Sequence, residues 1–174
     1  MFSDPQKNVA LFDIQDGMKV VDIGAGSGFY SIEAAKRVGA RGRVYAVDVQ
    51  QDLLAKLKNS AGVIGLHNIE AVWGNAEKIG GTKLREAVAD RVILSNTLFQ
   101  VEPPDRDNLC LEIKRITRPG GMVMVIDWAG GTPLAPKTLV TAVVAQGLFQ
   151  KAGFTLDRSF DAGDHHYGLI FKRS

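Results

Sequence analysis

The sequence predicts one α/β domain, residues 1–174, built on a mostly parallel β-sheet covered by helices. Short apolar, β-branched runs alternate with helical patterns along the chain, which is the pattern of βαβ units. The last two such runs have no helix between them, so they are expected to pair as an antiparallel hairpin. With 174 residues, 45% of them hydrophobic, the chain can bury one core but is short for two domains.

Seven runs rich in β-branched and other apolar residues are expected to form the strands. The run at 122–127 is apolar almost throughout, which indicates a strand that is buried on both faces. In chain order the predicted strands are 19–23, 43–49, 69–73, 91–95, 122–127, 154–160 and 167–172.

Five segments between these strands carry apolar residues at helical spacing. In segment 105–117, for example, Leu109, Ile113 and Ile116 lie on one helical face. Residues 118–121, Arg-Pro-Gly-Gly, are expected to end that helix and turn the chain. The predicted helices are 28–38, 51–60, 80–89, 105–117 and 137–151.

The segment after the first strand is rich in glycine. Asp22 ends the apolar run, and Gly24, Gly26 and Gly28 follow at alternate positions. Glycine lets the backbone turn tightly and approach a ligand, and the helix that begins there offers free N–H groups to an anion. The spacing fails the dinucleotide fingerprint Gly-x-Gly-x-x-Gly, because Phe29 stands where the third glycine belongs. An ordinary tight turn is the alternative to a nucleotide-like ligand here.

This Asp-x-Gly-x-Gly-x-Gly segment, 22–28, resembles the first motif of the class I S-adenosylmethionine (SAM) methyltransferases. Residues 118–121 and 152–154 resemble the turns that open the fifth and sixth strands of that family. The chain is similar, within the class, to the small ubiquinone/menaquinone-biosynthesis-type group. The resemblance covers about residues 2–173. It implies a Rossmann-like, seven-stranded sheet in the order 3-2-1-4-5-7-6, with helices on both faces and an antiparallel last strand.

The resemblance also implies SAM as the cofactor and a set of residues that bind it. Asp48 would accept hydrogen bonds from the ribose hydroxyls, with Val49 beside the adenine. Asn75 replaces an aspartate that holds the adenine amino group in many relatives, and its amide oxygen can still accept that bond. Asn96 stands where relatives contact the methionine portion. The expected set is Asp22, Gly24, Ala25, Gly26, Ser27, Gly28, Phe29, Asp48, Val49, Asn75, Ala76 and Asn96.

Candidate catalytic residues should lie at the carboxyl ends of the parallel strands, where such sheets bind ligands. Asp127 follows the fifth strand, and His165 and His166 precede the last. Either histidine could act as a general base, since an unperturbed imidazole titrates near about 6.5. The alternative is that one is an exposed turn residue and the other faces a helix. No metal is expected, because residues 96–97 are Asn-Thr where a catechol-type metal site needs an acid.

The acceptor is expected to be a small molecule. The net charge is only +2 and the basic residues are dispersed, which disfavours nucleic acid without excluding it. An RNA or protein acceptor, and a SAM-binding scaffold without catalysis, are the alternatives. The identity of the acceptor and the methylated atom stay open.

The remaining expectations concern surroundings and assembly. Residues 1–18, including Phe2, are expected to cover the cofactor, and a site without large insertions could be completed by a second subunit in a homodimer. No apolar stretch approaches the roughly 18 residues that a membrane helix needs. The chain has no signal region, and its single cysteine, Cys110, excludes an internal disulfide. We therefore expect a cytoplasmic protein without membrane contact.

Overall fold

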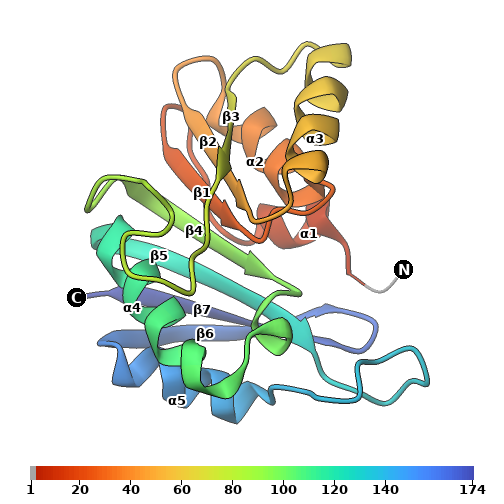
Figure 1. The fold of residues 1–174 in the computed structure, drawn as a ribbon, viewed down its shortest axis with the longest axis vertical. Helices are drawn as coiled ribbons and strands as arrows, with labels where there is room; N and C mark the ends of the chain where they lie inside the picture. The colour runs from red at the N-terminus through yellow and green to blue at the C-terminus, as the bar shows by residue number, and fades with distance from the viewer. Residues whose placement is uncertain (1–2) are drawn as a thin grey trace.

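The sheet has seven strands in the order β3-β2-β1-β4-β5-β7-β6, as expected (Figure 1). The computed structural model describes residues 3–174. Strands β1 to β5 run parallel to one another, and β7 lies antiparallel between β5 and β6. The strands are β1 (Lys19–Ile23), β2 (Arg43–Asp48), β3 (Ile69–Trp73), β4 (Ala89–Ser95), β5 (Thr117–Trp128), β6 (Phe154–Gly163) and β7 (His166–Arg173).

Helices cover both faces of the sheet. The helices are α1 (Pro5–Ala10), α2 (Phe29–Val38), α3 (Gln51–Val63), α4 (Arg106–Ile116) and α5 (Ala142–Lys151), with short 3-10 turns η1 (Leu98–Gln100) and η2 (Pro103–Asp105). In β4, Val92 and Leu94 face the core under α4 and α5, whereas Ile93 faces the core under α1 and α2. Residues 92–94 of this strand are all apolar because both faces of the sheet are buried there.

The predicted helix at 80–89 is wrong. Residues 74–88, between β3 and β4, form a loop of turns. Lys83 and Ala87 adopt positive φ angles of 59° and 53°, which a helix does not allow. The backbone N–H groups of Gly80 and Thr82 donate to the side chain of Glu112 on α4 instead of to helical carbonyls. Contacts with a distant helix therefore override the local pattern.

Several element boundaries also differ from the predictions, and two of these differences have a clear local cause. The last helix begins at Ala142 and not at 137, because the side chain of Thr141 caps it by accepting from the N–H of Val144. Residues 118–121 end α4 as expected, but they form a bulge within β5: strand pairing jumps from Ala89–Thr117 to Arg91–Met122.

None of the helices in residues 3–174 combines the length and the apolar character that crossing a membrane requires.

Candidate functional site

The glycine loop joins the carboxyl end of β1 to the start of α2 and leaves an open approach at its centre. Gly26 has φ of 53°, and a Cβ placed there would find nothing closer than 3.9 Å. Gly28 has φ of 80°, and a Cβ there would collide with the side chain of Leu57 on α3. Gly28 therefore serves close packing, whereas Gly26 leaves space for a ligand to reach the backbone.

Asp48, at the end of β2, faces this loop. One carboxylate oxygen accepts from the N–H of Gly26 at 2.8 Å, and the other accepts from the N–H of Gln50 at 2.8 Å. Each oxygen retains a further acceptor position. The carboxylate thus fixes the loop and can still accept hydrogen bonds from hydroxyl groups.

A first cavity of about 290 Å³ lies beside Asp48, at the carboxyl ends of β1, β2 and β3. It brings together six predicted cofactor residues: Gly24, Gly26, Asp48, Val49, Asn75 and Ala76. Leu53, Val101 and Leu109 also line it. These three residues were not among the predicted site residues, because apolar residues in or beside a predicted helix indicate core packing and not the wall of a ligand site.

A second cavity of about 540 Å³ lies on the other side of the glycine loop. Gly24, Gly26 and Gln100 line both cavities, so the two are adjacent. Predicted residues in the wall of the second cavity are Asp22, Gly24, Ala25, Gly26, Ser27, Phe29, Asn96 and His166. Gly28 lines neither cavity. Two neighbouring spaces separated by one loop can hold a cofactor and a second molecule in contact.

Asn96 and His166 meet at the second cavity from the ends of β4 and β7. The imidazole Nε2 of His166 lies 3.0 Å from Oδ1 of Asn96, and its Nδ1 lies 2.8 Å from the carbonyl oxygen of Asp164. The carbonyl oxygen of Asp164 and Oδ1 of Asn96 both only accept, so Nδ1 donates to the first, and Nε2 donates to the second unless the Asn96 amide turns its NH₂ group toward the ring. The Trp128 ring lies against the imidazole, with 4.4 Å between centroids.

The backbone of Asn96 is held in an uncommon conformation. Its φ is 51°, a left-handed value that asparagine tolerates better than most residues. Its N–H donates to the carbonyl of Ile126, and its own carbonyl accepts from the side chain of Gln100. These bonds aim the amide at His166.

The other two predicted catalytic residues lie elsewhere. His165 is an exposed turn residue with φ of 62°; its Nδ1 is 3.1 Å from the carbonyl oxygen of Gly130, and it lines neither cavity. Asp127 is fully buried, and its carboxylate accepts from the N–H groups of Phe99 and Trp128. Burial raises the pKa of Asp127 to about 6, although these hydrogen bonds act to lower it. Asp127 therefore lies behind the cavity wall and holds η1.

Asp22 is a second buried carboxylate, only 2% exposed, at the edge of the second cavity. One of its oxygens accepts from the hydroxyl of Ser31 at 2.6 Å. Burial raises the pKa of Asp22 to about 7; the Ser31 hydrogen bonds oppose the rise, and the nearby charge of Asp48 adds to it.

The N-terminal segment contributes Ser3 and Pro5 to the second cavity. Asn8 of α1 anchors this segment, donating to the hydroxyl of Tyr30 and to the carbonyl of Ala162. The expected contribution of Phe2 falls outside the described residues. Within residues 3–174, no three His, Cys, Asp or Glu side chains are grouped so as to hold a metal ion.

Comparison with known families and curated proteins points to methyl transfer. The family model for a methyltransferase domain matches residues 14–162. The chain is 29% identical over 115 residues to a demethylmenaquinone methyltransferase of Geobacillus stearothermophilus, covering 66% of this chain and 47% of that protein. Against the corresponding protein of Bacillus cytotoxicus, identity is 27% over 122 residues, with 70% and 49% covered. The chain spans about half the length of the curated relatives it matches.

Solved structures share the fold over almost the whole chain. A SAM-dependent methyltransferase from Aquifex aeolicus superposes with a TM-score of 0.88 and 26% identity, covering 99% of this chain and 91% of that one. The [4+2]-cyclase SpnF superposes with a TM-score of 0.81 at 15% identity, covering 97% and 79%. The second likeness concerns the fold alone, and its name shows that this fold also serves other reactions.

Proposed function

The chain belongs to the methyltransferase-domain family, and from this premise we propose that it transfers a methyl group from SAM to a small-molecule acceptor. The observation that carries the proposal is the open position of Gly26 beside the carboxylate of Asp48, with a cavity on either side of the loop.

SAM would lie across the glycine loop. Its adenosine would occupy the first cavity, with the ribose hydroxyls on Asp48 and the adenine among Val49, Asn75 and Ala76. Its methionine portion would extend into the second cavity, where the carboxylate of Asp22 can face the ammonium group. The assignment is supported by the spare acceptor positions on Asp48 and by the open space over Gly26.

The acceptor would share the second cavity. About 540 Å³ falls within the range of about 300–1,000 Å³ typical of small-molecule sites. Phe29, Tyr30 and Trp128 give this cavity an aromatic wall, and His166 adds a polar group. These features favour a compact acceptor with an apolar body and one polar reacting group.

Methyl transfer mainly requires the protein to align the acceptor with the methyl group. The acceptor's nucleophilic atom forms a bond to the methyl carbon while the carbon–sulfur bond breaks, and the sulfonium leaves as a neutral thioether. Holding the reactants in line can lower such a barrier by up to about 7–11 kcal/mol. If the nucleophile carries a proton, Nε2 of His166 could accept it only in the form protonated at Nδ1 alone, with Oδ1 of Asn96 turned away from Nε2.

The first test is calorimetric titration of the protein with S-adenosylhomocysteine, using NAD as the control ligand. Micromolar binding of the first and no binding of the second is the expected result. A screen of small acceptors with SAM carrying a labelled methyl group would then detect turnover. Binding of neither nucleotide would overturn the cofactor assignment. Binding without transfer to any acceptor class would favour the scaffold alternative.

Two more predictions complete the proposal. We expect the protein to act in the cytoplasm, which cell fractionation would test. We also expect a homodimer, which sedimentation would distinguish from a monomer.

A further inference from the structure

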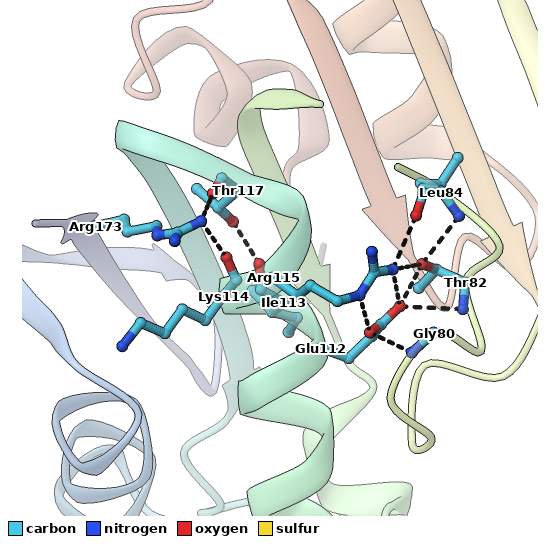
Figure 2. A network of polar contacts seen from close by, with 9 residues as sticks. All are labelled: Gly80, Thr82, Leu84, Glu112, Ile113, Lys114, Arg115, Thr117 and Arg173. Carbon is cyan, nitrogen blue, oxygen red and sulfur yellow. Dashed lines mark hydrogen bonds and ion pairs between the residues drawn. The ribbon is translucent and has the colours of Figure 1, made fainter. Parts of the chain in front are cut away.

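Glu112 of α4 lies far from the glycine motif in the sequence and is fully buried. Its carboxylate receives five hydrogen bonds (Figure 2). One oxygen accepts from the N–H of Gly80 at 2.7 Å and from Nε of Arg115 at 2.8 Å. The other accepts from the N–H and the hydroxyl of Thr82 and from Nη2 of Arg115. Arg115 also donates to the carbonyl of Leu84, so the pair holds the loop at 80, 82 and 84.

The same loop supports the wall of the first cavity. The carbonyl of Gly81, between the two residues bound by Glu112, accepts from the N–H of Asn75 at 3.0 Å. The N–H of Gly81 donates to Lys78, whose own N–H donates to the carbonyl of Asn75. A Cβ on Gly81 would collide with the carbonyl oxygen of Asn75, so these two parts of the loop are in direct contact.

This support matters because the wall has no regular structure of its own. Residues 74–88 contain no helix or strand, yet Asn75, Ala76 and Glu77 line the first cavity. Their placement therefore depends on contacts outside the loop. The Glu112–Arg115 pair provides such contacts, because it anchors three loop residues, Gly80, Thr82 and Leu84.

We propose that Glu112 is a positioning residue for the cofactor: paired with Arg115, it fixes residues 80–84 and, through Gly81, holds Asn75 and Ala76 where the adenine end of SAM binds. The inference rests on the proposed function, since it assigns that wall to the adenine. Glu112 itself lines neither cavity, so it would act on the cofactor only through the loop.

A carboxylate suits this place better than the isosteric amide. All five partners of Glu112 are donors, and a carboxylate only accepts. The NH₂ group of a glutamine would face one set of these donors and could not accept their hydrogen bonds. Burial alone would raise the pKa of Glu112, but the hydrogen bonds from Arg115, Thr82 and Gly80 outweigh it and lower the pKa to about 2. The group is thus ionised under any ordinary assay condition.

The test is the affinity for S-adenosylhomocysteine, measured by calorimetry on the full chain at a temperature where every variant is folded. Glu112→Gln should raise the dissociation constant at least tenfold. In the Asn75→Ala background the same change should raise it by a clearly smaller factor, because the part of the wall that Glu112 holds is already lost. A double-mutant cycle of this kind isolates coupling from general destabilisation.

The matched control is Arg91→Met. Arg91 is also a buried charged residue, and it binds the carbonyls of Phe12 and Asp13, away from the loop at 74–88. This variant should lose stability and keep its affinity. An unchanged dissociation constant in Glu112→Gln, or an equal factor in both backgrounds, would overturn the inference.

A milder variant covers the case in which Glu112→Gln does not fold. Thr82→Val removes the hydroxyl donor and leaves the ion pair intact, so a two- to fivefold loss of affinity is expected, and no loss would count against the proposal. Failure of the unaltered protein to bind S-adenosylhomocysteine would overturn the proposed function and this inference together. Normal binding by both the protein and its variants would overturn this inference alone.

Discussion

At the scale of single residues, the two carboxylates beside the glycine loop occupy different environments. Asp48 accepts from the backbone N–H groups of two residues, whereas Asp22 accepts hydrogen bonds from Ser31 and is almost without solvent contact. Burial disfavours the charged form of a carboxylic acid, and hydrogen bonds favour it. The same residue type thus fixes the loop backbone at Asp48 and has a raised pKa at Asp22.

The pH dependence of stability should reveal the raised pKa of Asp22. Burial raises its pKa from 3.8 to about 7, so the folded state holds a proton that the unfolded state has lost between those values. Stability from this group is present below about pH 4 and is lost as pH rises through 7. From pH 5 to pH 8 the loss is roughly 3 kcal/mol, because about two pH units (from 5 to 7) each contribute about 1.4 kcal/mol. Urea unfolding of the protein and of Asp22→Asn at both pH values measures it, and a parallel pH trend in the two would contradict the assignment.

Gly26→Val should fold but lose the cofactor. The added side chain enters open space over the loop, where a ligand would lie. Gly17→Val is the matched control, because Gly17 also has a positive φ, 84°, and nothing within 4 Å. Both variants should lose roughly 1–3 kcal/mol from the strained backbone. Only Gly26→Val should lose affinity for S-adenosylhomocysteine, by at least a hundredfold, and equal affinity in the two variants would mean that the cofactor does not lie on this loop.

At the scale of elements, the site is built from connections that other elements hold in place. The loop at 74–88 is held by α4 through Glu112, and η1 is held by β5 through Asp127. The strands and helices supply a fixed frame, and side chains on them, Glu112 in α4 and Asp127 in β5, give the connections one conformation. Buried carboxylates serve here because they accept several backbone N–H groups at once.

Asp127→Asn should loosen η1. One donor of the new amide must face either the N–H of Phe99 or that of Trp128, which leaves a buried donor unsatisfied at a cost of about 1–3 kcal/mol. The expected result is lower stability to urea and faster hydrogen exchange at the amide of Phe99. The amide of Ile32 in α2 donates to the carbonyl of Gly28, away from η1, and serves as an internal reference. Unchanged exchange at Phe99 would mean that Asp127 does not hold this turn.

At the scale of the whole molecule, a continuous sheet buried on both faces places its ligand sites at one edge. Strands β1 and β4 are neighbours in the middle of the sheet, at the reversal of strand order (Figure 1). Residues at or just beyond the carboxyl ends of these two strands line both cavities. Such a reversal opens a crevice, because the connections on its two sides leave in opposite directions. The walls of the two cavities therefore come from elements in both halves of the sheet.

Binding at this crevice should stabilise the whole fold. With S-adenosylhomocysteine at 100 times its dissociation constant, the free energy of unfolding should rise by about 2.7 kcal/mol. Thermal unfolding with and without the ligand measures this, and NAD at the same concentration should have no effect. Equal stabilisation by both nucleotides would argue for a general nucleotide site in place of one for SAM.

The sequence by itself determined the strands, most helices and the positions of the glycine loop, Asp48 and Asn75, because these follow from local spacing and from motifs next to strand ends. The order of the strands came from the family resemblance and not from the pattern. Only the tertiary structure decided how residues far apart meet. Glu112 accepts hydrogen bonds from the backbone N–H groups of Gly80 and Thr82, so these groups are not available for the helix expected at 80–89. His166 meets Asn96 across 70 positions of the chain, while His165 beside it points elsewhere. Such contacts depend on which strands become neighbours in the folded sheet, so the local sequence pattern does not predict them.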